Sequence, residues 1–596
     1  MSIKNKLFSC PTNTIDEFEC FAKKALDLGA THIYVSDLPK SIWQWDRDRN
    51  DPYPAWGMES SAIFKVVMPQ KLKPFLPADY ASSNISILKE RAEVLKRLGM
   101  KAAFHGCEPG WLPEEVYRAF PSWRGARCDH PRRARKAYFS PCLDHPEVVE
   151  MYRDAVKELC SIIPIEYFNF KTNDAGGGLC WSAGLYPGIN GATHCTSIPM
   201  AQRVTGFLSA IQMGAGKAGV DATAGFGSGI PESEAKSIMP YLKPGQFVGK
   251  AKKDGIIHSG GAGFFSDYYS SCTYPVIGIP QVVKFAEQLE DLHSSKVESE
   301  VISFQSLNSL EYFELYQRFM EKPTIGVVNR YVLLREIAQT FVGTEKADAL
   351  TTCWDYIYKA VENMRLIDNG GNVILLGCVS QRWLNRPFVP FPLELSAEER
   401  DYFREFQFQA NSEEEAADLM NLQGQEHING YSGTWLATKY LEQSILYYQK
   451  AARMIEQILE SITGQDYKAR LEILRLRIKA MICLIRTAVH AARYQEILDR
   501  TDYFVIPEDS TKVWTDQGDP RLKQLQNLAR AEIDNVLELA HLMETSEEPL
   551  LMLAANPSQE YTFAFGPDLK VQLRKKAGIM MDHLLDLNRL YTRFNN

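Results

Sequence analysis

The chain has 596 residues, 45% of them hydrophobic and 23% charged, which is typical of a globular protein with two or three domains. Its formal net charge of -8 at pH 7 argues against a nucleic-acid partner, because proteins that bind nucleic acid carry a basic excess. No stretch reaches the roughly 18 apolar residues that a membrane span needs, so no membrane association is predicted.

The 12 cysteines and the amino-terminal segment bear on the compartment. The cysteines are scattered and form no CxxC pair, which is typical of a protein from a reducing compartment. The first residues contain no apolar stretch long enough for a signal peptide. We therefore expect a cytoplasmic protein.

Short apolar runs alternate with amphipathic helical segments over the first 305 residues. Helical spacing of apolar residues marks segments such as 15–29, 85–99 and 145–163. The runs predicted as strands are 7–10, 31–36, 101–106, 165–171, 220–227, 247–251, 276–279 and 300–304. Eight strands alternating with helices predict an α/β fold of the (β/α)8 TIM-barrel type, with a doubly wound sheet as the competing interpretation.

The composition changes after residue 305. Long helical segments such as 440–462 and 469–498 replace the strand-like runs. We predict a catalytic barrel over 1–305 and a mostly α-helical domain over 306–596. The helical domain is expected to pack on the barrel or on a second subunit, which would make the protein a homo-oligomer.

A polar, glycine-rich segment follows the predicted fourth strand. Lys171, Asn173 and Asp174 come first, then three consecutive glycines, then Trp181 and Tyr186. Active sites of TIM barrels lie at the carboxyl ends of the strands, so we expect these side chains at the mouth of the barrel. Aromatic rings beside polar groups suit a sugar ligand. The structural alternative is a glycine-rich loop in which the aspartate caps the next turn.

Acidic and aromatic side chains also follow other predicted strands. They occur after the second and third strands, and again in the loop 259–271. A cluster of acids and rings at strand ends predicts a carbohydrate site. The candidate substrate-binding residues are Asp37, Trp43, Trp45, His105, Glu108, Lys171, Trp181, Tyr186, Asp267 and Tyr268.

The pair Asn173–Asp174 is followed by LYPGINGATHC and, further on, by EYFELYQRFMEKPTIGVVNRYVLLREIAQTFVG. In these features the chain resembles the TIM-barrel glycoside hydrolases of the hexosaminidase and α-glucuronidase kind. The resemblance extends to about residue 365. It implies a glycosidase that acts on a short oligosaccharide.

The resemblance also implies roles for the two catalytic candidates. In hexosaminidases that use the acetamido group of the substrate as nucleophile, two adjacent polar residues follow the fourth strand. Asn173 would orient the acetamido group, and Asp174 would protonate the leaving oxygen. Many such enzymes have an acidic residue in the first position, whereas endo-β-N-acetylglucosaminidases with an asparagine there are also known.

Two other functions remain open from the sequence. A glycosidase with two protein carboxylates would pair Asp174 with Glu108 or Asp267. If its substrate were a uronide, the sugar carboxylate could meet the basic segment that contains Arg132, Arg133 and Arg135. The third reading is a carbohydrate-binding protein without catalysis.

No cofactor and no metal are predicted. The chain lacks a P-loop motif, and the run 225–229 fails the dinucleotide pattern because Pro231 occupies the place of its last glycine. His105, Glu108 and His130 show no spacing that is typical of metal ligands.

Overall fold

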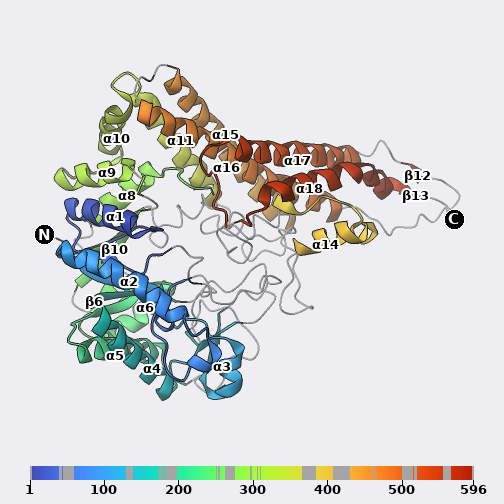
Figure 1. Cartoon of the computed structure of the whole chain (residues 1–596). Helices are drawn as coiled ribbons and strands as arrows, with labels where there is room; N and C mark the ends of the chain where they lie inside the picture. Colours follow the sequence, from blue (N-terminus) through green and yellow to red (C-terminus); the bar gives the residue numbers. More distant parts are fainter. Residues whose placement is uncertain are drawn as a thin grey trace. The chain divides into compact units, whose positions relative to one another are not determined.

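A computed structural model gives the fold of the chain (Figure 1). Two compact units are present: one comprises Met1–Asp267 and Lys284–Arg330, and the other comprises Tyr268–Val283 and Tyr331–Asn596. The structure describes residues 3–38, 43, 60–128, 138–172, 179–180, 197–249, 251–252, 255–261, 276–294, 298–304, 307–308, 310–365, 384–406, 430–460, 462, 465–499, 514–515, 520–554 and 565–593.

The first unit is built around a closed barrel. Its strand order is β1–β11–β10–β9–β8–β7–β6–β3–β2, and pairing of β1 with β2 completes the circle. Every pairing is parallel except those of β9, which is antiparallel to β8 and to β10. The strands are β1 (Asn5–Ser9), β2 (His32–Tyr34), β3 (Lys101–Cys107), β6 (Ile165–Lys171), β7 (Thr223–Ser228), β8 (Gln246–Val248), β9 (Ala251–Lys252), β10 (Gly255–Gly261) and β11 (Ser299–Ser303). The described strands and helices thus form a TIM-like α/β domain, as predicted.

One predicted barrel strand is wrong. The run 276–279 is not part of the barrel, and Val276 instead forms an isolated antiparallel bridge with Leu551. The seventh parallel strand is β10, which pairs with β11. Its sequence, GIIHSGG, has three glycines and little apolar alternation. Glycine has a low strand propensity, so the local sequence does not favour a strand here. The strand forms because β10 pairs with its neighbour β11.

The connection between β8 and β10 departs from strand–helix alternation. Only six residues, 249–254, separate the two strands, and β9 takes up two of them. Gly249 turns the chain with a φ of 57°, a conformation that favours glycine. The predicted strand 247–251 is therefore broken at this glycine, and this unit of the barrel has no room for a helix.

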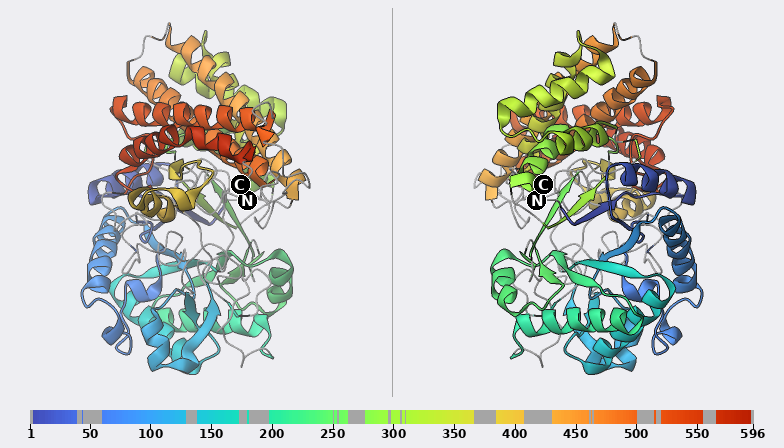
Figure 2. Two further views of the ribbon diagram at one scale, coloured as in Figure 1. Left: turned by 90° about the vertical axis from the view of Figure 1, so that its right-hand side faces the viewer. Right: turned by 90° about the vertical axis from the view of Figure 1, so that its left-hand side faces the viewer.

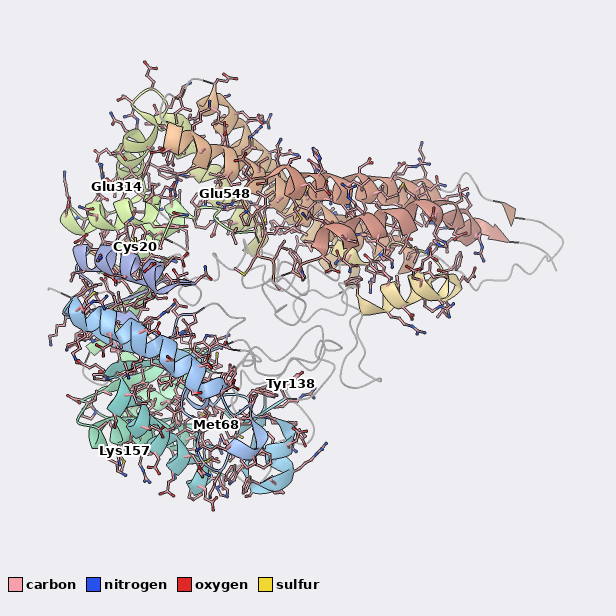
Figure 3. All side chains as sticks on the ribbon, in the orientation of Figure 1. Cys20, Met68, Tyr138, Lys157, Glu314 and Glu548 are labelled. Atoms are coloured by element: carbon pink, nitrogen blue, oxygen red, sulfur yellow. The ribbon has the colours of Figure 1, made fainter. Side chains whose placement is uncertain are left out.

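Helices surround the strands of the first unit (Figure 2). Cys20 of α1 and Lys157 of α4 are exposed on the outside of this layer (Figure 3). The helices are α1 (Ile15–Asp27), α2 (Tyr80–Arg97), α3 (Glu114–Ala119), α4 (Pro146–Ile162), α5 (Met200–Lys217), α6 (Glu232–Ile238), α8 (Val282–Ser294) and α9 (Leu310–Glu321), and a hairpin of β4 (Arg124–Arg127) and β5 (Phe139–Pro141) follows α3.

Helix α1 illustrates how the sequence defines these elements. Thr14 and Glu17 form a capping box, in which each side chain accepts a hydrogen bond from the main-chain N–H of the other. One face of the helix is buried at the spacing of an amphipathic helix, through Phe18, Phe21, Ala22 and Ala25.

The barrel interior contains an apolar layer. Its members come from six strands and are in contact, which is possible only on the inner side of the closed sheet: Leu7, Tyr34, Ala103, Tyr167, Phe247 and Val301. Because side chains alternate along a strand, the residues two positions further on also face the interior, nearer the carboxyl ends. The apolar layer therefore forms the base of any site at the mouth.

The described part of the second unit consists mainly of helices. Helix α15 packs against α11 and α16, and α17 packs against α16 and α18. The position of α16 between two neighbours explains why its apolar residues exceed one face. The helices are α11 (Ala347–Arg365), α14 (Ala397–Glu405), α15 (Gly430–Leu459), α16 (Gln465–Asp499), α17 (Pro520–Thr545) and α18 (Leu569–Asp582), α10 (Val327–Val342) begins in the first unit and ends in the second, and β12 (Trp514–Thr515) pairs with β13 (Thr592–Arg593).

A fully buried ion pair connects α17 and α18. The Nζ of Lys576 lies 2.5 Å from Oε1 of Glu532, and neither side chain is exposed. Thr487 and His490 of α16 also contact the two oxygens of Glu532, each at 2.8 Å. Burial opposes ionisation of Glu532, but Lys576 and His490 outweigh it and lower the pKa of this carboxyl. The cluster thus joins three helices through one buried charge.

We expect Lys576→Met to destabilise the protein by about 3–5 kcal/mol, because it leaves the Glu532 carboxylate buried without its cation. Lys575→Met is the matched control, since the neighbouring lysine pairs with Glu398 at the surface and such pairs contribute about 0–1 kcal/mol. Thermal unfolding of both variants tests this. Equal losses would contradict it.

Candidate functional site

Polar side chains lie at the carboxyl ends of the barrel strands, directly above the apolar layer. We call Ser9, the hydroxyl of Tyr34, Asp37, His105 and Asn169 the polar layer. Ser9, His105 and Asn169 each follow a member of the apolar layer by two positions, so the strand pleat turns them to the same side. The Ser9 hydroxyl donates to the carboxylate of Asp37, which joins β1 to the segment after β2.

Asn169 connects three strands within the polar layer. Its Nδ2 donates to the hydroxyl of Tyr34 at 3.2 Å, and its Oδ1 accepts from the main-chain N–H of Gly227 at 3.1 Å. A Cβ atom at position 227 would lie 2.4 Å from that same Oδ1, so the contact requires glycine. Burial raises the pKa of Tyr34 and the nearby Asp37 carboxylate raises it further, which keeps the phenol neutral.

His105 is held by its main chain. Its N–H donates to the hydroxyl of Ser36 at 2.7 Å, and its carbonyl oxygen accepts from that hydroxyl at 2.7 Å. Ser61 donates to the same carbonyl, and the ring of Tyr34 lies edge-on to the imidazole. Since the backbone is fixed on both sides, the half-buried imidazole has a defined position in the polar layer.

Lys171 is the last residue of β6 and is buried. Its carbonyl oxygen accepts from the main-chain N–H of Glu108 at 2.9 Å, which joins the ends of β3 and β6. Asp37, His105 and Lys171, three of the predicted residues, are thus brought to the same edge of the barrel.

Glu108 lies beneath the protein surface with no exposed area. Its Oε1 accepts from the N–H of Ile63 at 2.6 Å, and its Oε2 accepts from the N–H of Gly110 at 2.9 Å and from the Tyr152 hydroxyl at 2.7 Å. Burial raises the pKa of Glu108 to about 7, although these three hydrogen bonds lower it. The contacts indicate that Glu108 fixes the segment near residue 63 onto the loop after β3.

The other predicted site residues fall into two groups. Trp43 is described and is buried, with 2% of its surface exposed. The rest lie outside the described residues, as do the arginines of the basic segment: Asn173, Asp174, Trp45, Trp181, Tyr186, Asp267, Tyr268, Arg132, Arg133 and Arg135.

Sequence reasoning missed Ser9, Tyr34 and Asn169. No period-two signal marks them, because neighbouring residues that point to opposite faces of these strands are buried alike. The contacts among them join distant strands and leave no local pattern.

No group of three or more His, Cys, Asp or Glu side chains in the described ranges could hold a metal ion. Within the same ranges, no helix is both long and apolar enough to cross a membrane.

No protein-family model and no curated protein sequence matches the chain. Among solved structures it is similar to a family 36 α-galactosidase from Geobacillus stearothermophilus, with a TM-score of 0.32 and 11% identity over 53% of this chain and 41% of that chain. A xylosidase from Aspergillus niger is similar with a TM-score of 0.28 and 12% identity, over 60% of this chain and 49% of that chain. A chitobiase from Flavobacterium johnsoniae is similar with a TM-score of 0.30 and 10% identity, over 87% of this chain and 73% of that chain. The chain spans about two fifths of the galactosidase's length, so its own residues carry the functional argument.

We expect the stability of the protein to fall as the pH rises from about 5 to 7, in part because of Glu108. The pKa of Glu108 is about 7 in the folded protein and near 4.5 in the unfolded chain. Between these two pH values the folded protein keeps a proton that the unfolded chain has lost. The free energy of unfolding lost through Glu108 should approach about 3 kcal/mol at pH 7, and it should change little at higher pH.

Thermal unfolding of Glu108→Gln across this pH range measures that contribution. The variant should lose less stability than the wild type between pH 5 and 7, whereas Glu115→Gln, which removes an exposed carboxylate of α3, should keep the wild-type slope. Parallel curves for all three proteins would contradict the raised pKa of Glu108.

Proposed function

We propose that this protein is a glycoside hydrolase that cleaves a short glycan containing N-acetylhexosamine, with the acetamido group of the substrate as nucleophile. In this proposal Asp174 protonates the leaving oxygen and Asn173 orients the acetamido group. Asp37 and His105 of the polar layer bind hydroxyl groups of the sugar.

One observation carries the proposal: β6 ends at Lys171, at the carboxyl edge of the barrel beside the polar layer. Asn173 and Asp174 follow by two and three residues. Because TIM barrels place their chemistry at this edge, the position of the pair in the sequence, directly after β6, supports its assignment to the reaction.

The reaction has two steps. The acetamido oxygen attacks the anomeric carbon as the glycosidic bond breaks, and Asp174 gives its proton to the leaving oxygen. Water then opens the cyclic intermediate and returns a proton to Asp174, so the anomeric configuration is retained. Asn173 acts by holding the acetamido group in reach of the anomeric carbon, which lowers the entropic cost of ring closure.

A mechanism with two protein carboxylates receives less support from the described residues. Glu108, one proposed partner of Asp174, is fully buried and both its oxygens already accept hydrogen bonds. A nucleophilic or base carboxylate has to reach the sugar or a water molecule beside it. The other partner, Asp267, is outside the described residues.

Asp174→Asn should lower kcat on unactivated disaccharides by about 10² or more, because the leaving oxygen no longer receives a proton. Aryl glycosides with acidic leaving groups should lose less. Steady-state kinetics on both substrate types checks this, with circular dichroism to verify folding. Full activity of the folded variant on a disaccharide would exclude Asp174 as the acid.

Asn173→Ala should lower kcat far more than it raises KM, because the interaction is made mainly in the transition state. The thiazoline analogue of the cyclic intermediate should also inhibit the wild type strongly. Inhibitor titration decides between the mechanisms. No inhibition at millimolar thiazoline together with hydrolysis of a glucuronide would favour two protein carboxylates and a role for the basic segment.

A further inference from the structure

Arg91 of α2 is a buried arginine that connects the first two loops at the carboxyl end of the barrel. Only 2% of its surface is exposed. Its Nη1 donates to the carbonyl oxygens of Val35 at 3.2 Å and Asp37 at 2.9 Å. Its Nη2 donates to both the carbonyl oxygen and the hydroxyl of Thr12, each at 2.8 Å. One guanidinium therefore joins the segment after β1 to the segment after β2.

These contacts fix Asp37 at two points. Arg91 holds its carbonyl oxygen from the side of α2, and Ser9 donates to its carboxylate from the end of β1. Ser9 is two positions beyond Leu7 of the apolar layer, so the carboxylate is held on the inner side of the barrel. The hydrogen bonds from Nη1 go to main-chain oxygens, so the guanidinium holds this segment through its backbone, and its charge also attracts the Asp37 carboxylate.

We infer that Arg91 is a positioning residue that sets the carboxylate of Asp37 to accept hydrogen bonds from hydroxyl groups of the bound sugar. The inference rests on the proposed glycosidase function and deepens it. It assigns sugar recognition to the Asp37 carboxylate and names Arg91 as the residue that holds it in place. Ring hydroxyls are donors, and a carboxylate is an acceptor with two oxygens, so the two chemistries match.

The geometry of the guanidinium makes arginine necessary at this position. A planar fork with donors in fixed directions can reach four acceptors on two separate segments at once. The ring of Phe18 lies 4.7 Å from the guanidinium carbon and covers one face of it. A lysine would keep the charge but has a single nitrogen, so it cannot hold both segments in the same arrangement.

Arg97 provides a matched control on the same helix. It pairs with Glu19 of α1 at 2.8 Å, and its side chain is 60% exposed. Arg97→Lys makes the same chemical change on the same helix, in an exposed pair that contributes only about 0–1 kcal/mol. Thermal unfolding measures any general weakening of the fold in Arg91→Lys, whereas loss of Asp37 positioning should appear in its kinetics and crystal structure and not in those of Arg97→Lys.

The kinetic test uses full-length protein and nitrophenyl N-acetyl-β-glucosaminide. Arg91→Lys should raise KM about tenfold or more with a smaller change in kcat, as should Asp37→Ala, since a hydrogen bond to a charged group is lost. The double variant should be no worse than Asp37→Ala alone, because Arg91 acts through Asp37. Additive effects of the two substitutions would overturn the inference.

A crystallographic test does not depend on the substrate. In Arg91→Lys without ligand, the Ser9 hydroxyl and the Asp37 carboxylate should separate beyond hydrogen-bond distance, while Arg97→Lys keeps the contact. An unchanged contact in Arg91→Lys would overturn the positioning role. If the wild type neither binds nor hydrolyses any glycoside, the proposed function and the sugar-binding role fall together, and the crystal structures still decide whether Arg91 positions Asp37.

Discussion

Closure of the barrel is the constraint on which the candidate site depends. Because β1 pairs with both β2 and β11, the sheet has an inner side that water cannot reach from an open edge. Large apolar side chains such as Tyr167 and Phe247 fill that interior. Polar residues one layer above them, such as Ser9 and Asn169, can then satisfy their hydrogen bonds with one another, with the main chain of the strands or at the open carboxyl end. The polar layer is therefore a consequence of closure.

The sequence predicts the barrel better than it predicts each strand. Apolar runs at 101–106 and 165–171 mark β3 and β6 because both faces of a barrel strand are buried. The same criterion fails for β10, whose glycines carry no apolar signal, and it selects 276–279, whose burial comes from other contacts. Apolar runs report burial, and burial alone does not say which segment pairs with which.

The candidate site could likewise be predicted only in part. Asp37, His105 and Lys171 could be predicted because each lies at or near the carboxyl end of an apolar run, and that position is a local property. Their supports could not be predicted from local pattern, because the contacts join distant residues. Ser9 reaches Asp37 over 28 positions, Arg91 reaches Thr12 over 79, and Asn169 reaches Tyr34 over 135.

The contact between Asn169 and Gly227 has a consequence for how the protein can evolve. The amide oxygen occupies the space that a Cβ atom at position 227 would need. A side chain at 227 therefore requires either that the Asn169 amide moves and gives up its hydrogen bond to Gly227 or that position 169 has accepted a smaller side chain. Homologues that keep this barrel should show the two positions changing together, which makes the pair a marker for tracing descent where overall identity has decayed.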